Sequence, residues 1–287
     1  MGSNSTNNGA GSVGGSDIVY ALAMNGTNNL FVGGSFSIVD GGSIPANGIA
    51  SWNGNSWNIL GSNSTNNGVG VGGIVYALAM NGTNQLFVGG QFSSVDGTSI
   101  LVNNIASWNG NSWNILGSNS TNNGVGSGGS DIISALAMNG TNTLFVGGQF
   151  SNVDGGSISV NNIASWNGNS WNILGSNSTS NGVVGNSNPG VDTLAMNGTN
   201  TLLVGGIFSN VDGSLISANN IAVWDGNLWH SIGTESDAGI TAIVSNDIDS
   251  VFVAGSFKIS PDGFCTPHLM QGNFFFQNWS KFILFSI

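Results

Sequence analysis

Short hydrophobic segments separated by turn residues dominate the chain. Residues 18–26, "IVYALAMNG", alternate large and small apolar side chains and end in an Asn-Gly pair, and residues 29–39 form a second apolar segment. Two shorter segments, 48–52 and 56–60, are joined through Asn53-Gly54. Asn-Gly pairs favour tight turns between antiparallel strands, and no stretch of helix length shows a 3.6-residue period. We therefore expect four short antiparallel strands here, named a to d in chain order.

The four-strand pattern repeats along the chain. The first tryptophan of the motif "WNGNSW", or "WDGNLW" in the last copy, stands at Trp52, Trp108, Trp166 and Trp224, 56 to 58 residues apart. Four strands in a repeat of this size predict the blades of a β-propeller. A fifth unit begins near Gly239 and loses the pattern after residues 251–257. The expected fold is an all-β propeller with five four-stranded blades, four regular and one degenerate at the C-terminus. One domain, 1–287, would contain blades at about 16–61, 73–117, 130–175, 190–233 and 238–287.

The paired tryptophans predict contacts between blades. A two-residue turn would place Trp57 opposite Ala50, and a four-residue turn would place it opposite Trp52. Both registers put the two indoles on one face of the sheet. Each indole buries about 200 Å² when covered, so we expect the neighbouring blade to cover the pair. The repeated pair Gly33-Gly34 lies inside a strand, where glycine often marks a close approach, here expected from a neighbouring tryptophan.

The order of these features resembles the kelch-type propeller repeat, in which a strand ends in two glycines and an aromatic residue and a tryptophan follow. The string "FVGGSF…NGIASWNGNSWNILG" is similar to the kelch-like repeats of bacterial surface proteins and fungal cortical polarity markers. The resemblance covers about residues 16–257 and implies a propeller fold without implying one function. The Gly/Asn/Ser linker between blades, such as 61–73, makes the unit longer than the usual kelch repeat.

Charge narrows the classes of partner. Only two residues are basic and the net charge is −11, so the surface lacks the cations that neutralise phosphates. Nucleic-acid partners and anionic membrane surfaces are therefore not expected. No run of 18 apolar residues occurs, so we expect no membrane insertion, and the polar start shows no secretory signal. An extracellular or particle-surface location is favoured, although the sequence leaves the compartment unknown.

The expected strand order sorts the loops onto two sides of each blade. The b–c loops and the d–a linkers form a long-loop side, and the a–b and c–d turns form a short-turn side. Each long-loop side carries an aspartate, giving the candidate ligand-binding residues Asp40, Asp96, Asp154 and Asp212, with Asp262 in the fifth unit. The alternative is that each aspartate closes a turn ahead of its glycine. The calcium-loop spacing is absent, so neither a metal nor a cofactor is predicted.

Two further classes of residue bear on function. Candidate N-glycosylation sites fit Asn-x-Ser/Thr at Asn25, Asn63, Asn81, Asn119, Asn139, Asn177 and Asn197. Residues unique to one unit are few, chiefly His230, Cys265 and His268, which are too few for a catalytic constellation or a zinc site. Galactose oxidase, a kelch-type enzyme, uses copper ligands that include tyrosines, whereas Tyr20 and Tyr76 are expected in packed inner strands.

These observations favour a non-catalytic, surface-exposed propeller that serves as a protein-interaction or structural module. One alternative is a multivalent lectin that binds glycans through the b–c and d–a loops, where repeated weak sites would gain from avidity. Another alternative is a building block of a fibre, a coat or a virion surface, in which the chain forms an oligomer or an array. The expected partner is a protein or a glycan on the long-loop side.

Overall fold

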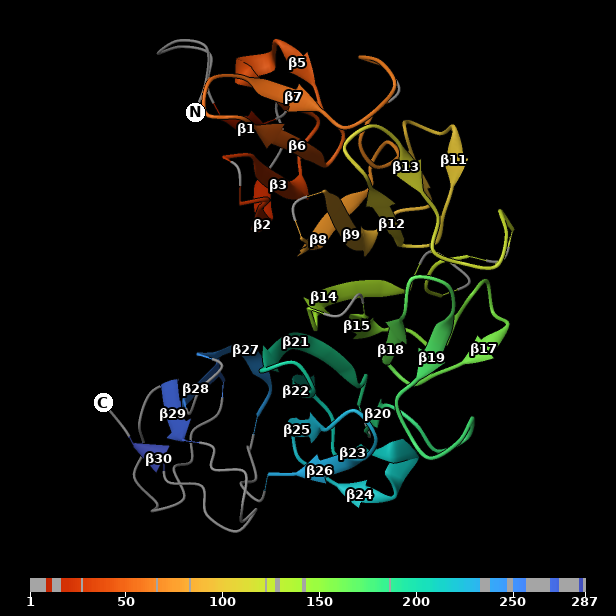
Figure 1. The fold of residues 1–287 in the computed structure, drawn as a ribbon, viewed down its shortest axis with the longest axis vertical. Coiled ribbons are helices and arrows are strands. Elements are labelled where there is room, and N and C mark those ends of the chain that lie inside the picture. Colours follow the sequence, from red (N-terminus) through yellow and green to blue (C-terminus); the bar gives the residue numbers. More distant parts are fainter. Residues whose placement is uncertain are drawn as a thin grey trace. The chain divides into compact units, whose positions relative to one another are not determined.

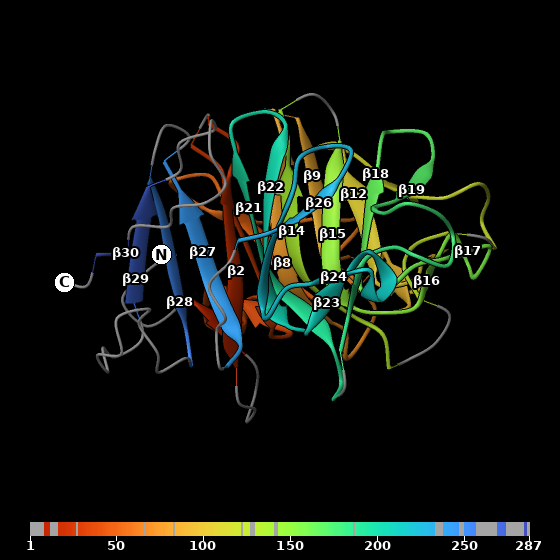
Figure 2. The ribbon, with the colours of Figure 1, turned by 90° about the horizontal axis from the view of Figure 1, so that it is seen from below.

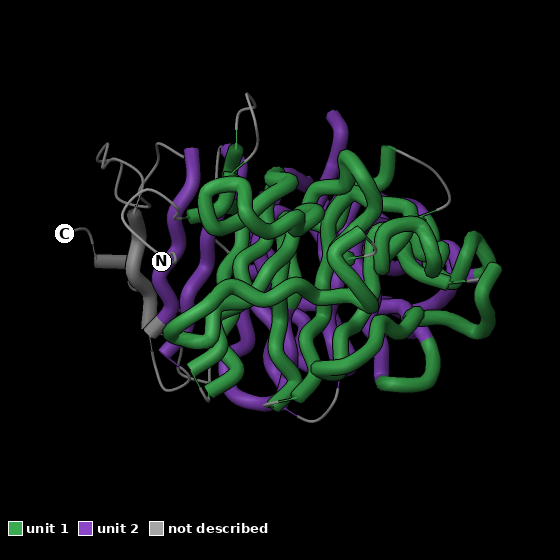
Figure 3. Tube along the Cα trace, turned by 90° about the horizontal axis from the view of Figure 1, so that it is seen from above, with its two compact units in different colours: residues 1–136, 152–157, 168–170 green, residues 137–151, 158–167, 171–287 purple. Residues whose placement is uncertain are grey.

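A computed structural model gives the structure of the chain as two compact units, which are described separately (Figure 3). Unit 1 contains residues 1–136, 152–157 and 168–170, and unit 2 contains residues 137–151, 158–167 and 171–287. The structure describes residues 9–11, 17–26, 28–65, 67–82, 84–121, 123–126, 130–140, 143–185, 187–232, 238–246, 250–256, 269–273 and 284–285.

Four-stranded antiparallel sheets make up most of the described chain (Figure 1). Each has its strands in the order a-b-c-d along the sheet, which is the order of a propeller blade. Blade 1 contains β2 (Ile18–Met24), β3 (Leu30–Ser35), β6 (Ile49–Trp52) and β7 (Trp57–Ile59). Blade 2 contains β8 (Ile74–Asn81), β9 (Gln85–Gln91), β12 (Ile105–Trp108) and β13 (Trp113–Asn114).

The remaining sheets follow the same order. Blade 3 contains β14 (Ile132–Met138), β15 (Leu144–Gln149), β18 (Ile163–Trp166) and β19 (Trp171–Ile173), and blade 4 contains β21 (Gly190–Asn197), β22 (Thr201–Ile207), β25 (Ile221–Trp224) and β26 (Trp229–Ser231). The last sheet contains β27 (Ile240–Ser245), β28 (Ser250–Gly255), β29 (Leu269–Asn273) and β30 (Leu284–Phe285). The described residues include no α-helix, so the predicted all-β propeller-type fold is confirmed.

Short strands in the b–c loops and in the segments that precede an a strand form small additional sheets on the long-loop side. Figure 2 shows two of them, β23 and β24, at the lower end of β21 and β22. In blades 1 and 2 these elements are β1 (Ala10–Gly11), β4 (Ile38–Val39), the 3₁₀ segment η1 (Asp40–Gly42), β5 (Ile44–Pro45), β10 (Ser94–Val95) and β11 (Ile100–Leu101). In blades 3 and 4 they are β16 (Asn152–Val153), β17 (Ile158–Ser159), β20 (Val183–Val184), β23 (Asn210–Val211), η2 (Asp212–Ser214) and β24 (Ile216–Ser217).

The c–d turn has four residues, which decides between the two registers. Trp52 pairs directly with Trp57, and their ring centroids are 5.5 Å apart. The side-chain oxygen of Asn53 accepts hydrogen bonds from the backbone N–H groups of Asn55 and Ser56, at 3.0 and 2.8 Å. An asparagine side chain that closes its own turn explains why the turn is longer than the two-residue Asn-Gly type. The direct pairing recurs at Trp108–Trp113, Trp166–Trp171 and Trp224–Trp229.

The second tryptophan of a pair contacts the preceding blade. In unit 1, Trp113 is buried and its Nε1–H donates a 3.0 Å hydrogen bond to the carbonyl oxygen of Leu60, at the end of blade 1. In unit 2, Trp229 of blade 4 donates a 2.9 Å hydrogen bond to the carbonyl oxygen of Leu174 of blade 3. A buried indole usually needs a partner for its N–H group, and the neighbouring blade provides it here. The expectation that neighbouring blades cover the tryptophans is confirmed at these two junctions.

The two glycines of each pair have different roles. A Cβ atom on Gly33 would lie 2.5 Å from Cγ1 of Val75, in the first strand of the next blade. A Cβ atom on Gly34 would collide with the carbonyl oxygen of Ile18 in its own blade, where the pairing of β2 with β3 contains a bulge. The expectation that a neighbouring tryptophan approaches the glycines is therefore wrong. An aliphatic side chain of the next blade approaches the first glycine, and backbone approaches the second.

The close approach at the first glycine recurs at other junctions within a unit. In unit 1, a Cβ atom on Gly89 would lie 2.7 Å from Cγ2 of Ile133. In unit 2, Gly147 meets Val191 in the same way, and a Cβ atom on Gly205 would lie 2.7 Å from Cγ2 of Ile240. Real Cβ atoms do not approach neighbours this closely, so each junction requires bare backbone at this position.

Candidate functional site on the long loops

The described residues of the d–a linkers join neighbouring blades. In unit 1, Val69 of the linker forms an antiparallel bridge with Val95 of the next b–c loop. Gly70 N–H donates to the carbonyl oxygen of Ser94 at 2.8 Å, and Asp96 N–H donates to the carbonyl oxygen of Gly68 at 2.9 Å. The same arrangement recurs farther along the chain in the pairs Val125–Val153 and Val183–Val211. The linker therefore fixes the b–c loop of the following blade.

A buried asparagine holds the linker to its own blade. The side-chain oxygen of Asn67, which is 0% exposed, accepts a 3.2 Å hydrogen bond from the backbone N–H of Asn47. Its Nδ2 group donates to the carbonyl oxygen of Ser64, and Asn47 Nδ2 donates back to the carbonyl oxygen of Asn67. The pairs Asn103–Asn123 and Asn161–Asn181 repeat this exchange. Buried polar groups need such partners, so the exchange allows a polar linker to pack without charge.

The candidate aspartates lie in the b–c loops, as expected, and the carboxylates of Asp96, Asp154 and Asp212 bind the preceding linker. Asp96 Oδ1 accepts the backbone N–H of Ser62 at 2.7 Å. Asp154 accepts both the N–H of Ser118, at 2.8 Å, and its hydroxyl, at 2.9 Å. The same two groups of Ser176 donate to Asp212 in unit 2.

The backbone of each aspartate has an unusual conformation. Asp40, Asp96, Asp154 and Asp212 all have φ between 53° and 55°, in the left-handed region that asparagine and aspartate tolerate better than most residues. The local turn is closed by backbone, as in the 3.3 Å bond from Ser99 N–H to the carbonyl oxygen of Asp96. The carboxylates of Asp96, Asp154 and Asp212 therefore connect blades, while the backbone of each residue occupies a turn. Direct ligand binding by the four aspartates stays a prediction.

A pocket of about 360 Å³ lies between the linker and the b–c loop of blade 2. Residues 70–73 form one wall, and residues 91–94 together with Thr98, Asn103 and Asn104 form the remainder. None of these described lining residues is charged. Two large apolar side chains on the same pair of loops face solvent, because Val71 is 85% exposed and Leu101 is 68% exposed.

The candidate glycosylation sites fall into two structural groups. Asn63, Asn119 and Asn177 are exposed in the linkers, and the side-chain oxygen of each accepts hydrogen bonds from the threonine two residues later. Asn25 and Asn197 are buried at the ends of a strands or just after them, and Asn81 and Asn139 are partly buried at the same place. Modification at any of these sites stays a prediction, and the three linker asparagines are the accessible ones.

The two tyrosines lie side by side on the first strands of blades 1 and 2. Their ring centroids are 4.9 Å apart. Burial raises the pKa of Tyr76, and the neighbouring Tyr20 raises it further. Tyr20 itself is 44% exposed, so the expectation that both tyrosines are packed is wrong for Tyr20.

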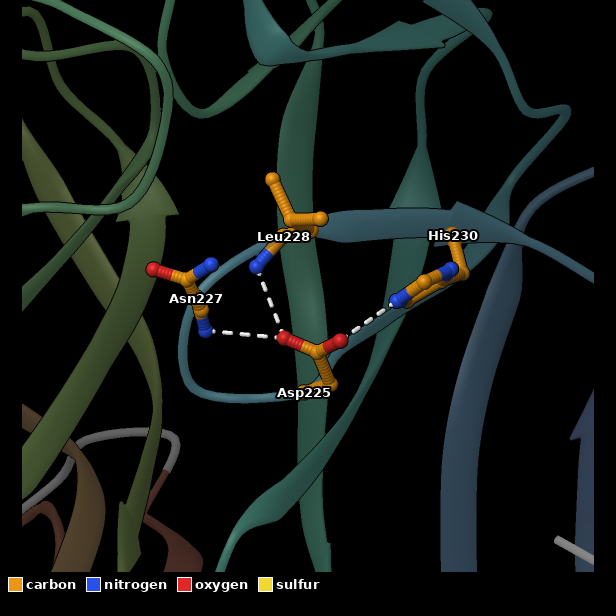
Figure 4. A network of polar contacts seen from close by, with 4 residues as sticks. All are labelled: Asp225, Asn227, Leu228 and His230. Atoms are coloured by element: carbon orange, nitrogen blue, oxygen red, sulfur yellow. Dashed lines mark hydrogen bonds and ion pairs between the residues drawn. The ribbon is translucent and has the colours of Figure 1, made fainter.

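Among the described residues, a hydrogen-bonded histidine–aspartate pair distinguishes blade 4. Nε2 of His230 lies 2.7 Å from Oδ2 of Asp225, and Oδ1 of Asp225 accepts the backbone N–H groups of Asn227 and Leu228 at 2.8 and 2.7 Å (Figure 4). Partial burial acts to raise the pKa of Asp225, but the bonds from His230, Leu228 and Asn227 outweigh it and hold that pKa below its usual value. Asp225 therefore closes the c–d turn as Asn53 does in blade 1, with His230 as an added partner.

The described residues contain no group of three or more His, Cys, Asp or Glu side chains that could hold a metal ion. Cys265, His268 and Asp262 lie outside the described residues. None of the described helical segments is long and apolar enough to cross a membrane.

The Asp225–His230 pair predicts a pH dependence of stability. The pKa of Asp225 is lower in the folded chain than in the unfolded chain. Its contribution to the free energy of unfolding is therefore present above the unfolded pKa and is lost as pH falls through the folded pKa. Asp225→Asn keeps the turn acceptor, as Asn53 shows, but removes the charge. The melting temperature of wild type should exceed that of the variant at pH 7, and the gap should close below about pH 4. The double variant Asp225→Asn/His230→Asn is the control, and a gap that stays constant down to about pH 3 would contradict the assignment.

Comparisons with known proteins leave the family open. No protein-family model matches the chain, and no curated protein matches it. Among solved structures, the chain is similar to the WD40 repeats of RRP9, with a TM-score of 0.45 and 12% sequence identity over 100% of this chain and 84% of that chain. The propeller-type fold follows from the repeated four-stranded sheets of the chain itself.

Proposed function

We propose that the chain is a non-catalytic protein-interaction module that binds its partner on the long-loop side. The observation that carries this proposal is the exposure of Val71 and Leu101 on a clamped pair of loops in blade 2. We name the d–a linker 70–73 and the b–c loop 93–104 of this blade the loop surface. Val71 borders the pocket of the loop surface, and Leu101 pairs with Ser94, which lines the same pocket.

Two physical arguments support this use of the loop surface. An apolar side chain that faces water gains about 1.5–3 kcal/mol when a partner buries it fully, so Val71 and Leu101 are favourable anchors. The loops that carry them are fixed by the Val69–Val95 bridge and by the bond from Ser62 to Asp96. Fixed loops lose little conformational entropy on binding, which leaves more of the burial energy for affinity.

Charge limits the choice of partner. The chain has a net charge of −11 and only two basic residues, so an acidic partner would be repelled over most approaches. A partner with an apolar contact and a neutral or basic surround fits best, because complementary charge speeds association.

The double variant Val71→Ser/Leu101→Ser tests the proposal. A photoreactive residue at position 71 identifies the partner in an extract of the native source, and calorimetry on the two purified proteins then gives the dissociation constant. The variant should weaken binding by about 10-fold or more, because it removes two apolar contacts. Its melting temperature should stay unchanged, because both side chains are exposed.

Leu228→Ser is the matched control for this experiment. Leu228 is 55% exposed, but it lies in a c–d turn on the short-turn side. It should leave the affinity unchanged. The proposal fails if no protein that cross-links at position 71 binds the purified chain, or if Leu228→Ser weakens binding as much as the double variant does.

A second candidate function is a lectin that uses the long-loop side. The uncharged pocket of about 360 Å³ favours it, because Thr98 contributes a hydroxyl to its lining and Asn103, whose Nδ2 group is bound to the carbonyl oxygen of Asn123, contributes a side-chain oxygen. A sugar of neutral charge would match such groups, since its hydroxyls both donate and accept hydrogen bonds.

A glycan array separates this candidate from the first. If the lectin role holds, Thr98→Val removes a lining hydroxyl and Asp96→Ala releases the linker from the b–c loop, and each should reduce binding by about 10-fold. Asp225→Asn, on the other side of its blade, should bind as wild type. An array on which wild type retains no glycan, or on which both loop variants bind as wild type does, rules the lectin role out.

A further inference from the structure

A second pocket lies at the opposite end of the same blades. Its volume is about 440 Å³, and it opens between the a–b and c–d turns of blades 1 and 2 in unit 1. Phe31, Leu86 and Trp108 contribute its apolar part, and asparagines from four turns and one strand contribute its rim. None of its described lining residues is charged. It shares no residue with the loop surface.

The pocket is formed before any ligand arrives. Trp113 of blade 2 donates its Nε1–H to the carbonyl oxygen of Leu60, and Leu60 lines the pocket. Phe31 and Leu60 of blade 1 pack in one core cluster with Leu86 and Trp108 of blade 2. The two walls therefore come from blades whose spacing is fixed by a buried hydrogen bond and a shared core. A site of this kind needs no reorganisation, so binding costs little free energy for ordering the protein.

Three polar side chains of blade 1 offer hydrogen-bonding groups to the pocket. Asn53 uses its oxygen to close the c–d turn, and its Nδ2 group has no partner among the described residues. Asn58 uses its Nδ2 group on the carbonyl oxygen of Ser56, and its Oδ1 atom has no partner among the described residues. The side-chain amide of Asn29 makes no hydrogen bond within the described part of the chain. The rim therefore offers donors and acceptors together.

This combination selects a chemical class of ligand. A charged ligand would lose hydration without gaining an ion partner, because the described lining residues are uncharged. A purely apolar ligand would leave the amides of Asn29 and Asn53 unsatisfied. A neutral polyhydroxylated ring fits both the polar rim and the apolar part of the pocket. Its hydroxyls donate and accept hydrogen bonds, and its C–H face can lie against Trp108 and Phe31. We propose that this pocket, between the short turns of blades 1 and 2, binds a neutral saccharide unit.

Titration followed by ¹⁵N NMR tests the proposal on the full chain. The probes are D-glucose, D-galactose, D-mannose and N-acetyl-D-glucosamine, and the readout is the side-chain amide signals of Asn29 and Asn53, assigned by single substitution. At least one sugar should shift both signals saturably, with a dissociation constant on the order of 1 mM, as expected for a small ligand in an open pocket.

Two equivalent asparagines provide a matched pair of variants. Asn58→Ala removes the free acceptor of the pocket and should weaken the titration by about 5-fold or more. Asn114 occupies the same place in blade 2, makes the same local bond to Ser112, and does not line this pocket. Asn114→Ala should leave the Asn29 and Asn53 titrations unchanged, as should Thr98→Val in the loop surface.

Three results would overturn the proposal. The first is the absence of saturable shifts for all four sugars up to about 50 mM. The second is equal weakening by Asn58→Ala and Asn114→Ala. The third is a tighter titration of the same signals by an acetylated, amidated tetraglycine peptide, which would assign the pocket to peptide backbone. None of these results bears on the loop surface, whose variants and readout are separate.

Discussion

Bare backbone at one position of the b strand in blades 1 to 4 allows the next blade to pack against it. The first strand of the next blade brings Val75, Ile133, Val191 or Ile240 to a place where any Cβ atom would overlap it. That contact sets the spacing at which the indole N–H of Trp113 reaches Leu60 and that of Trp229 reaches Leu174. Since interiors are close-packed, a methyl group added at one of these glycines would disturb the indole hydrogen bond at the same junction.

The linkers hold neighbouring blades together on the long-loop side. Serine–aspartate bonds such as Ser118–Asp154 and asparagine exchanges such as Asn47–Asn67 join the linker to its own blade and to the next one. These bonds are made by neutral amides, hydroxyls and single carboxylates, which explains how a chain with 5% charged residues holds long polar loops in place. Both pockets are consequences of this rigidity, because each lies between segments that neighbouring contacts fix.

The sequence could predict the strands and the repeat because both are local. The Asn-Gly turns and the alternating strand "YALAM" depend on nearby residues, and the repeat is visible because the same short motif returns at Trp52 and Trp108. The register of the c–d turn stayed open because both turn lengths place the two indoles on one face. The structure selects the longer turn through the side chain of Asn53, whose oxygen accepts two backbone N–H groups of the turn.

Contacts between blades could be predicted only in part. The close approach at Gly33 was expected, but its partner was not, because tryptophan is the larger group while Val75 is the nearer one. The bond between Ser62 and Asp96 joins residues 34 positions apart, and no local pattern indicates it. The recurrence of a "GSNS" linker with an aspartate in the following b–c loop was the available signal. The pocket near Asn29 and Asn58 also depends on how two blades meet, which the sequence of one blade does not reveal.

A double-mutant cycle on Gly89 and Ile133 tests the central contact most directly. Urea unfolding of Gly89→Ala should show a loss of about 1–3 kcal/mol, because the new methyl group overlaps Cγ2 of Ile133. In the Ile133→Ala background the same change should be neutral or stabilising, since alanine is favoured over glycine in a strand once space exists. Equal losses in both backgrounds, or a more stable Gly89→Ala single variant, would contradict the account.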